Sequence, residues 1–256
     1  METRRFLTSS TVLFALAHNS LGVDQLEDGY FRALRFSKEQ APGYSSHALY
    51  RAMAKTSSSV CLRLYAQSTV VVHLRRYNES LLPKKGGKEI DFTLLYPRPF
   101  DISETIDVVY EKNKTVHLPL ASKQIVIEKG QVAAIYLPLY HQVGFLIEGE
   151  AIPVPKHEKT LLCIGDSIIQ GLGAHHPLMA LCEQISQLKG IQVLNQGLAG
   201  SLVNPKLIQK LAIPVHSILV ALGTNDWVIR ENLAELRGEM FALLGRIRKY
   251  YPEIPV

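Results

Sequence analysis

Three short polar stretches in the second half of the sequence carry residue types that can perform acyl transfer. The first is a Gly-Asp-Ser tripeptide ending at Ser167, the second ends at Gly200, and the third contains Asn225. A serine hydroxyl can attack an acyl carbon, and backbone or side-chain N–H groups can stabilise the oxyanion that forms. Glycine at position 200 would let its N–H approach that oxyanion without a side chain in the way. Ser167 is therefore a candidate nucleophile, and the N–H groups of Ser167, Gly200 and Asn225 are candidate donors.

Each polar stretch follows an apolar segment that is typical of a buried parallel strand. Strands are expected at 160–164, 191–195 and 216–222, alternating with helices at 176–189, 205–211 and 230–250. This alternation indicates βαβ units, in which the carboxyl ends of the strands meet at one edge of the sheet. The three polar stretches are therefore expected to face one crevice. Residues 252–256 have the pattern of an entry into a fourth strand.

The same polar residues also have purely structural interpretations. Asp166 can accept hydrogen bonds from free N–H groups at the start of the next helix, a role we favour over acid–base chemistry. Asp226 can cap the helix that follows it, and Asn195 can fix the loop that carries Gly200. Trp227, the only tryptophan, is as consistent with packing as with the wall of an acyl pocket. Taken alone, the Gly-Asp-Ser tripeptide is equally consistent with a nucleophilic serine and with a helix cap.

Taken in order, Gly-Asp-Ser, Asn-x-Gly-x-x-Gly and Gly-x-Asn-Asp resemble the sequence blocks of the SGNH (GDSL-type) hydrolases over residues 160–256. The resemblance implies that Ser167 is the nucleophile and that Gly200 and Asn225 complete the oxyanion hole. It implies a flavodoxin-like, three-layer α/β/α domain that needs no metal or organic cofactor. The residues expected to border the substrate are Asp166, Asp226 and Trp227.

The first 150 residues follow a different pattern, that of many short strands separated by turns. Strands are expected at 59–66, 69–77, 89–96, 105–111, 115–120, 124–130, 132–140 and 144–151. They predict an antiparallel, jelly-roll-like β-sandwich domain at 1–152, a proline-bearing linker at 151–159, and the SGNH domain at 159–256. Such a sandwich resembles the one that precedes the catalytic domain in some carbohydrate acetylesterases. The stretch GGKEIDFTLLY, 86–96, loosely resembles a Gly-x-Asp-Leu-Tyr element of one such group.

A general base is the part of the site that the sequence does not supply. SGNH enzymes resembling this chain take it from an Asp-x-x-His block, and no such block follows residue 226. Serine is a poor nucleophile at neutral pH without a base in reach. His175 and His176 lie near Ser167 in sequence, but a base also needs a carboxylate that orients it, and closeness in sequence does not supply one. We therefore expect these two histidines to flank the helix that begins near Pro177. We therefore expect the SGNH domain to be C-terminally incomplete and this chain to be inactive.

The composition of the chain argues against several other classes of function. The net charge is +5, but lysine and arginine are spread along the chain, which favours a solvated basic surface over a nucleic-acid site. Three cysteines without a CxxC motif suggest neither a disulfide framework nor a cysteine zinc site. No apolar run approaches the roughly 18 residues of a membrane span, and no membrane partner is expected. The first 20 residues make a poor signal peptide, so we expect them to belong to the folded domain and the protein to be cytoplasmic.

The first hypothesis is a serine esterase that cleaves small O-acyl esters, acetyl esters above all, through an acyl-enzyme on Ser167. An acetylated sugar is one candidate substrate. Two alternatives remain open at this point. The missing base motivates a carbohydrate- or ester-binding module without catalysis, and the same serine would also serve an acyltransferase. Hydrolysis and transfer use the same nucleophile and donors and differ in how the site excludes water.

Overall fold

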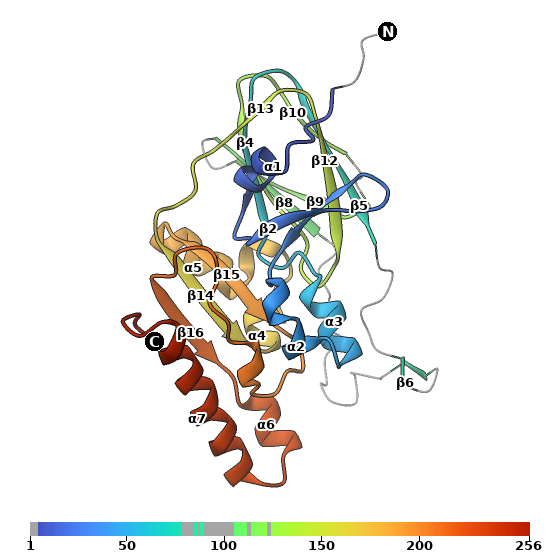
Figure 1. The fold of residues 1–256 in the computed structure, drawn as a ribbon. Coiled ribbons are helices and arrows are strands. Elements are labelled where there is room, and N and C mark those ends of the chain that lie inside the picture. Colours follow the sequence, from blue (N-terminus) through green and yellow to red (C-terminus); the bar gives the residue numbers. More distant parts are fainter. Residues whose placement is uncertain (1–4, 78–83, 86–87, 90–104, 112–113, 122–123) are drawn as a thin grey trace.

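The computed structural model describes residues 5–77, 84–85, 88–89, 105–111, 114–121 and 124–256. Figure 1 shows two antiparallel sheets in the upper part of the molecule and a parallel sheet with its helices in the lower part. The molecule is thus a mixed α/β structure with several antiparallel sheets. Within the described ranges, no helix combines the length and the apolar character needed to cross a membrane.

Two antiparallel sheets form the first part. One has the order β1-β4-β11-β8-β9, with β13 also paired to β4, and the other has the order β10-β5-β12-β3-β2. The strands of the first sheet are β1 (Ala17–His18), β4 (Cys61–Ala66), β8 (Thr105–Tyr110), β9 (Lys114–Pro119), β11 (Val132–Tyr136) and β13 (Ala151–Pro153). Those of the second are β2 (Gly22–Gln25), β3 (Phe31–Leu34), β5 (Val70–Arg76), β10 (Gln124–Ile127) and β12 (Val143–Glu148). A short hairpin pairs β6 (Lys84–Lys85) with β7 (Lys88–Glu89).

The two sheets share one hydrophobic core. Alternate residues of β4 and β5 point into it, among them Leu62 and Leu64 from one sheet and Val72 from the other, all fully buried. Helix α1 (Ser10–Leu16) adds Leu13 and Leu16 to the same core. The strands predicted from alternation are confirmed in the described ranges. The strand predicted at 89–96 and the motif-like stretch at 86–96 lie outside them, apart from the residues of β7.

The predicted linker is partly wrong, because its first three residues form β13 and pair with β4. The chain then enters β14 (Thr160–Gly165), the central strand of a three-stranded parallel sheet. Its neighbours are β15 (Gln192–Gly197) on one side and β16 (Ser217–Ala221) on the other. All three strands occupy the predicted positions. Parallel neighbours bring their carboxyl ends to the same edge.

Helices pack on both faces of the parallel sheet. Cys163 of β14 lies in a cluster with Cys182 of α5 (Leu181–Lys189), whereas Leu162 lies in a cluster with Leu243 and Ile247 of α7 (Leu233–Tyr250). Alternation along the strand therefore directs successive side chains to opposite helices. The remaining helical segments are α4 (Ser167–Gln170), η4 (Pro177–Met179), η5 (Pro205–Leu207) and α6 (Thr224–Ile229).

Two predictions in this part were wrong. The helix expected at 205–211 is a single 3₁₀ turn, η5, because Leu207, Ile208 and Leu211 are buried by packing from an irregular segment and not from one face of a helix. The strand expected at 252–256 does not form. One hydrogen bond, from the N–H of Ile218 in β16 to the carbonyl of Pro255, places that segment beside the sheet edge.

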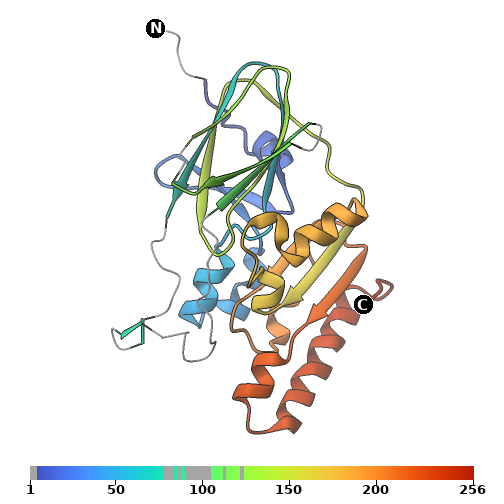
Figure 2. The same ribbon diagram turned by 180° about the vertical axis from the view of Figure 1, so that it is seen from behind.

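A segment between β3 and β4 lies against the parallel sheet. It contains η1 (Lys38–Gln40), α2 (Ala41–Tyr44) and α3 (Ala48–Ala54), and Figures 1 and 2 both show α2 and α3 beside β15 and α4. The fully buried guanidinium of Arg35 donates to the carbonyls of Asn195 (3.0 Å) and Gly197, and to Thr56 Oγ1 at 2.8 Å. Burial lowers the pKa of Arg35 to about 10, so the side chain remains charged at neutral pH. Residues far away in sequence thus hold β15, the strand that leads to the second polar block.

Candidate active site

Ser167 is the first residue of α4, directly beyond the carboxyl end of β14. Asp166 caps this helix by accepting a hydrogen bond from the N–H of Ile168 at 3.0 Å, which confirms the structural role predicted for its carboxylate. Burial raises the pKa of Asp166. The phenol of Tyr140 donates to the carbonyl of Ser167 at 2.9 Å. The serine therefore sits at a capped helix start whose backbone is held from both sides.

The hydroxyl of Ser167 is left without a hydrogen-bond partner among the residues that the structure describes. The nearby His176 is directed elsewhere, because its Nδ1 lies 2.8 Å from Asp107 Oδ2 of strand β8. His176 precedes η4, and His175 before it is exposed, so both flank that turn as predicted. An orienting carboxylate for His176 does exist, but it comes from a strand that the sequence analysis had not connected with the site.

Gly200 lies in the turn after β15, in the second polar block. Its φ of +76° is in the left-handed region, which favours glycine. Asn195 orders the path to this turn, because its side chain accepts from the N–H of Gly197 at 2.9 Å and donates to the carbonyl of Ile169 at 2.7 Å. The predicted role of Asn195 in fixing the loop is confirmed. The N–H of Gly200 has no acceptor within the described part of the chain, so it is free to serve a ligand.

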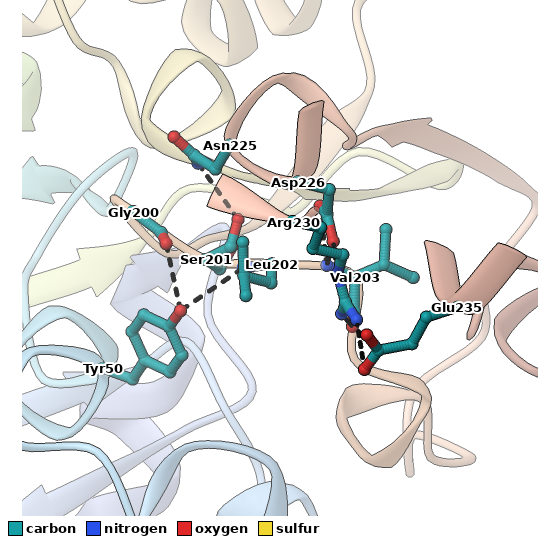
Figure 3. A network of polar contacts seen from close by, with 9 residues as sticks. All are labelled: Tyr50, Gly200, Ser201, Leu202, Val203, Asn225, Asp226, Arg230 and Glu235. Atoms are coloured by element: carbon teal, nitrogen blue, oxygen red, sulfur yellow. Dashed lines mark hydrogen bonds and ion pairs between the residues drawn. The ribbon is translucent and has the colours of Figure 1, made fainter. Parts of the chain in front are cut away.

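Asn225 lies on α6, just beyond β16, and reaches the turn of the second block. Its side-chain nitrogen donates to the carbonyl of Ser201 at 3.0 Å (Figure 3). One N–H of the amide is used in this bond, and the amide carries a second one. The register of the sheet aligns Gly165 with Gly197 and with Ala221, so the three strands end level. Ser167, Gly200 and Asn225 thus extend from the same edge of the sheet.

Asp226 is fully buried and fastens the loop after Gly200. Its two oxygens accept from the N–H of Val203 at 3.1 and 3.0 Å, and Arg230 Nε lies 2.6 Å from one of them (Figure 3). Arg230 in turn pairs with Glu235 at 2.8 Å. Asp226 lies within the first turn of α6 and does not cap the following helix, which was the structural role predicted for it. Asn232 caps that helix instead.

Trp227 is 70% exposed, so the packing role weighed for it is wrong. A large aromatic ring on the surface of α6, two positions from Asn225, is available to contact a ligand.

Tyr50 holds the turn that contains Gly200, and the sequence did not predict this role. Its hydroxyl donates to the carbonyl of Gly200 at 3.0 Å and accepts from the N–H of Leu202 at 3.3 Å (Figure 3). Burial raises the pKa of this phenol, which keeps it protonated and able to donate. Tyr50 belongs to α3, and 150 residues separate it from Gly200, so no local pattern could have connected them.

No family model matches this sequence, and neither does any curated protein. The fold, in contrast, matches several solved structures. A candidate GDSL-like lipase from Bacteroides ovatus ATCC 8483 aligns with a TM-score of 0.61 and 14% identity, over 99% of this chain and 73% of its own. The chain has the fold of the SGNH (GDSL-type) hydrolases.

Two further proteins are similar to this SGNH fold. A salicylyl-acyltransferase from a tetracycline biosynthetic pathway aligns over all of this chain and 72% of its own, with a TM-score of 0.76 and 19% identity. An acetyl xylan esterase from the rumen bacterium Butyrivibrio proteoclasticus aligns over 99% of this chain and 80% of its own, with a TM-score of 0.56 and 14% identity. At these identities the likeness is one of fold, and the chemistry has to be argued from the residues.

Proposed function

We propose that the protein is a serine esterase of the SGNH type that cleaves small O-acyl esters through an acyl-enzyme on Ser167. The observation that carries the proposal is the common sheet edge from which Ser167, Gly200 and Asn225 extend. The Ser167 oxygen bonds to the acyl carbon, the alcohol leaves with the proton of the hydroxyl, and water then releases the acid. This step requires a general base, and no Asp-x-x-His block follows residue 226.

The oxyanion hole in this proposal consists of the N–H groups of Ser167 and Gly200 and the amide of Asn225. Two features support it. The backbone N–H groups of Ser167 and Gly200 have no acceptor in the described ranges, and the amide of Asn225 is anchored by the carbonyl of Ser201. Fixed donors cost no reorganisation when charge develops, and losing one typically costs about 3 to 4 kcal/mol of transition-state stabilisation. Asp226 would act indirectly, by fixing the loop that carries Gly200.

We also propose a finer description of the fold. The two antiparallel sheets around one core are a jelly-roll-like β-sandwich, and the sheet order β15-β14-β16 with helices on both faces is the flavodoxin-like, three-layer SGNH domain. Substrate would then bind at the carboxyl edge of the parallel sheet, bordered by Asp166 and the exposed ring of Trp227. An acetyl ester on a carbohydrate is the proposed substrate class. Its support is the fold likeness to an acetyl xylan esterase.

The decisive experiment compares the full-length protein with its Ser167→Ala variant on a short-chain aryl ester. We expect kcat/KM to fall by at least about 10³-fold, because the nucleophile and its acyl-enzyme are lost. Ser217→Ala is the matched control, because Ser217 is the first residue of β16 and lies at the other end of this strand from the candidate site. This variant should retain activity. Equal hydrolysis by the wild type and Ser167→Ala would refute the proposal.

A second candidate is acyl transfer to an alcohol by the same serine, favoured by the likeness to the salicylyl-acyltransferase. Both reactions pass through the acyl-enzyme, and they diverge in whether water or a bound hydroxyl accepts the acyl group. Competition between water and a sugar alcohol as acceptors separates them. An ester product formed in excess of free acid would assign the protein to the transferases, and free acid alone would assign it to the esterases.

Tyr50→Phe tests how the oxyanion loop is held. The substitution removes one hydroxyl and leaves the carbonyl of Gly200 and the N–H of Leu202 without this partner. We expect kcat to fall roughly 10-fold with little change in KM, because the donor at Gly200 is displaced without loss of substrate contacts. The free energy of unfolding should fall by about 1 kcal/mol. Tyr65→Phe, on the partly exposed β4 residue Tyr65, is the control, and an equal kcat in both variants would contradict a positioning role for Tyr50.

A further inference from the structure

A second group of chemically active side chains lies where the antiparallel sheets meet η4. Asp107 and His117 face each other across the ladder of β8 and β9, and His176 reaches them from the residue before η4. Their ligand-type atoms all lie within 4.8 Å of one another. The group draws one residue from each of three separate elements. No local sequence pattern connects them, since 69 residues separate Asp107 from His176.

Both imidazoles converge on the same carboxylate. His117 Nδ1 lies 2.6 Å from Asp107 Oδ1, and His176 Nδ1 lies 2.8 Å from Oδ2. The two ring centroids are 4.4 Å apart. Two imidazole nitrogens and a carboxylate oxygen therefore lie as close together as the ligands of a single metal ion.

The carboxylate of Asp107 is fully buried, whereas the His176 and His117 side chains are 26% and 51% exposed. In the described part of the chain its ionic partners are these two histidines, and neither is a permanent cation as lysine or arginine would be. Hydrogen bonds from these rings and from the N–H of Leu178 hold this buried carboxylate, but none of the three donors is a permanent positive charge. A bound divalent cation would supply that charge, and the half-exposed His117 leaves it a route from solvent.

The geometry points to a zinc-binding site formed by Asp107, His117 and His176. Two imidazole nitrogens and one carboxylate oxygen are a donor set that Zn²⁺ accepts, with water as the fourth ligand. Zinc–ligand bonds of about 2.0 to 2.2 Å in a tetrahedron would spread the N···O distances to roughly 3.3 Å, a small side-chain movement. The N–H of Leu178 donates to Asp107 Oδ2 at 2.8 Å and would hold the carboxylate as an outer partner.

The site would connect the two parts of the molecule. Asp107 and His117 belong to the first antiparallel sheet, and His176 belongs to the segment that links α4 to α5. Bound zinc would therefore fix the segment that follows the helix of Ser167 against β8. This role is independent of the proposed esterase function, and it is measured without an activity assay.

Calorimetric titration of the metal-stripped full chain with zinc chloride tests the site. We expect one zinc per chain, binding with a Kd of about 1 μM or tighter, and a higher Tm in its presence. His117→Ala and His176→Ala should each weaken binding by more than about 100-fold, because losing a ligand costs more than losing an outer partner. His175→Ala, the exposed neighbour, is the matched control and should bind as the wild type does.

Two results would overturn the site. One is a wild-type Kd weaker than about 100 μM, which would leave a hydrogen-bonded triad that holds the two parts together without metal. The other is tight binding that survives both His117→Ala and His176→Ala, which would place the zinc elsewhere. His117 is half exposed, so its variant remains informative if His176→Ala fails to fold. Cobalt substitution adds an independent measurement, since tetrahedral ligation predicts intense visible absorption that His117→Ala should abolish.

Discussion

Gly197→Ala is expected to destabilise the protein by about 3 kcal/mol or more. A β-carbon at Gly197 would overlap the backbone nitrogen of Gln170 and lie 2.8 Å from the carbonyl of Asp166. Both contacts are backbone atoms, one of the last residue of α4 and one of its cap residue. They cannot rotate away as a side chain would, so β15 and α4 would have to separate.

Urea denaturation measures this effect, and Gly245→Ala is its control. Gly245 lies in α7, where an added β-carbon meets no atom within 4 Å. Alanine there should stabilise the helix by up to about 1 kcal/mol. If the free energy of unfolding of Gly197→Ala fell by less than about 1 kcal/mol, β15 and α4 would be able to separate at little cost in stability.

Arg35→Met is expected to cost about 3 to 5 kcal/mol of unfolding free energy. Methionine fills similar space but donates no hydrogen bond, so the carbonyls of Asn195 and Gly197 and the hydroxyl of Thr56 would each lose a buried donor. Buried acceptors without partners are costly. The two carbonyls belong to β15, so the damage should reach the candidate site.

Arg75→Ala provides the comparison, because this arginine is 56% exposed and pairs with Asp28 at 2.7 Å. Exposed ion pairs contribute less than about 1 kcal/mol. The midpoints of urea denaturation for the two variants should therefore differ clearly. If Arg35→Met lost no more stability than Arg75→Ala, the buried arginine would not be needed to hold β15.

Local patterns predicted the strands from residue 59 onward within the described ranges, and they singled out three candidate residues. The strands were predicted because alternation and short apolar runs are properties of neighbouring residues, and β14, β15 and β16 occupy the expected positions. Ser167, Gly200 and Asn225 could be placed at one edge because parallel strands align their carboxyl ends. The helix predicted at 205–211 was wrong because the apolar spacing of this segment reflects burial against α7, and tertiary packing overrides helix propensity.

The supporting residues could not be predicted in the same way. Arg35 holds β15, 160 residues further along the chain, Tyr50 holds the turn after it, 150 residues further along, and His176 meets a carboxylate from β8. No single-sequence pattern carries such pairings, because each partner alone resembles an ordinary helix or strand residue. The sequence therefore indicated the candidate groups, whereas the contacts that hold them in place are visible only in the three-dimensional structure.

The position of Arg35 has a consequence for how the protein is made. Its bonds to β15 join residues 160 positions apart, and ribosomes add about 5 to 20 residues per second. Roughly ten to thirty seconds therefore pass between synthesis of this arginine and synthesis of its partner strand. During that interval the guanidinium lacks the two carbonyls of β15 to which it donates in the folded protein. Closure of the parallel sheet is thus a late event in biogenesis, which must await the emergence of β15 from the ribosome.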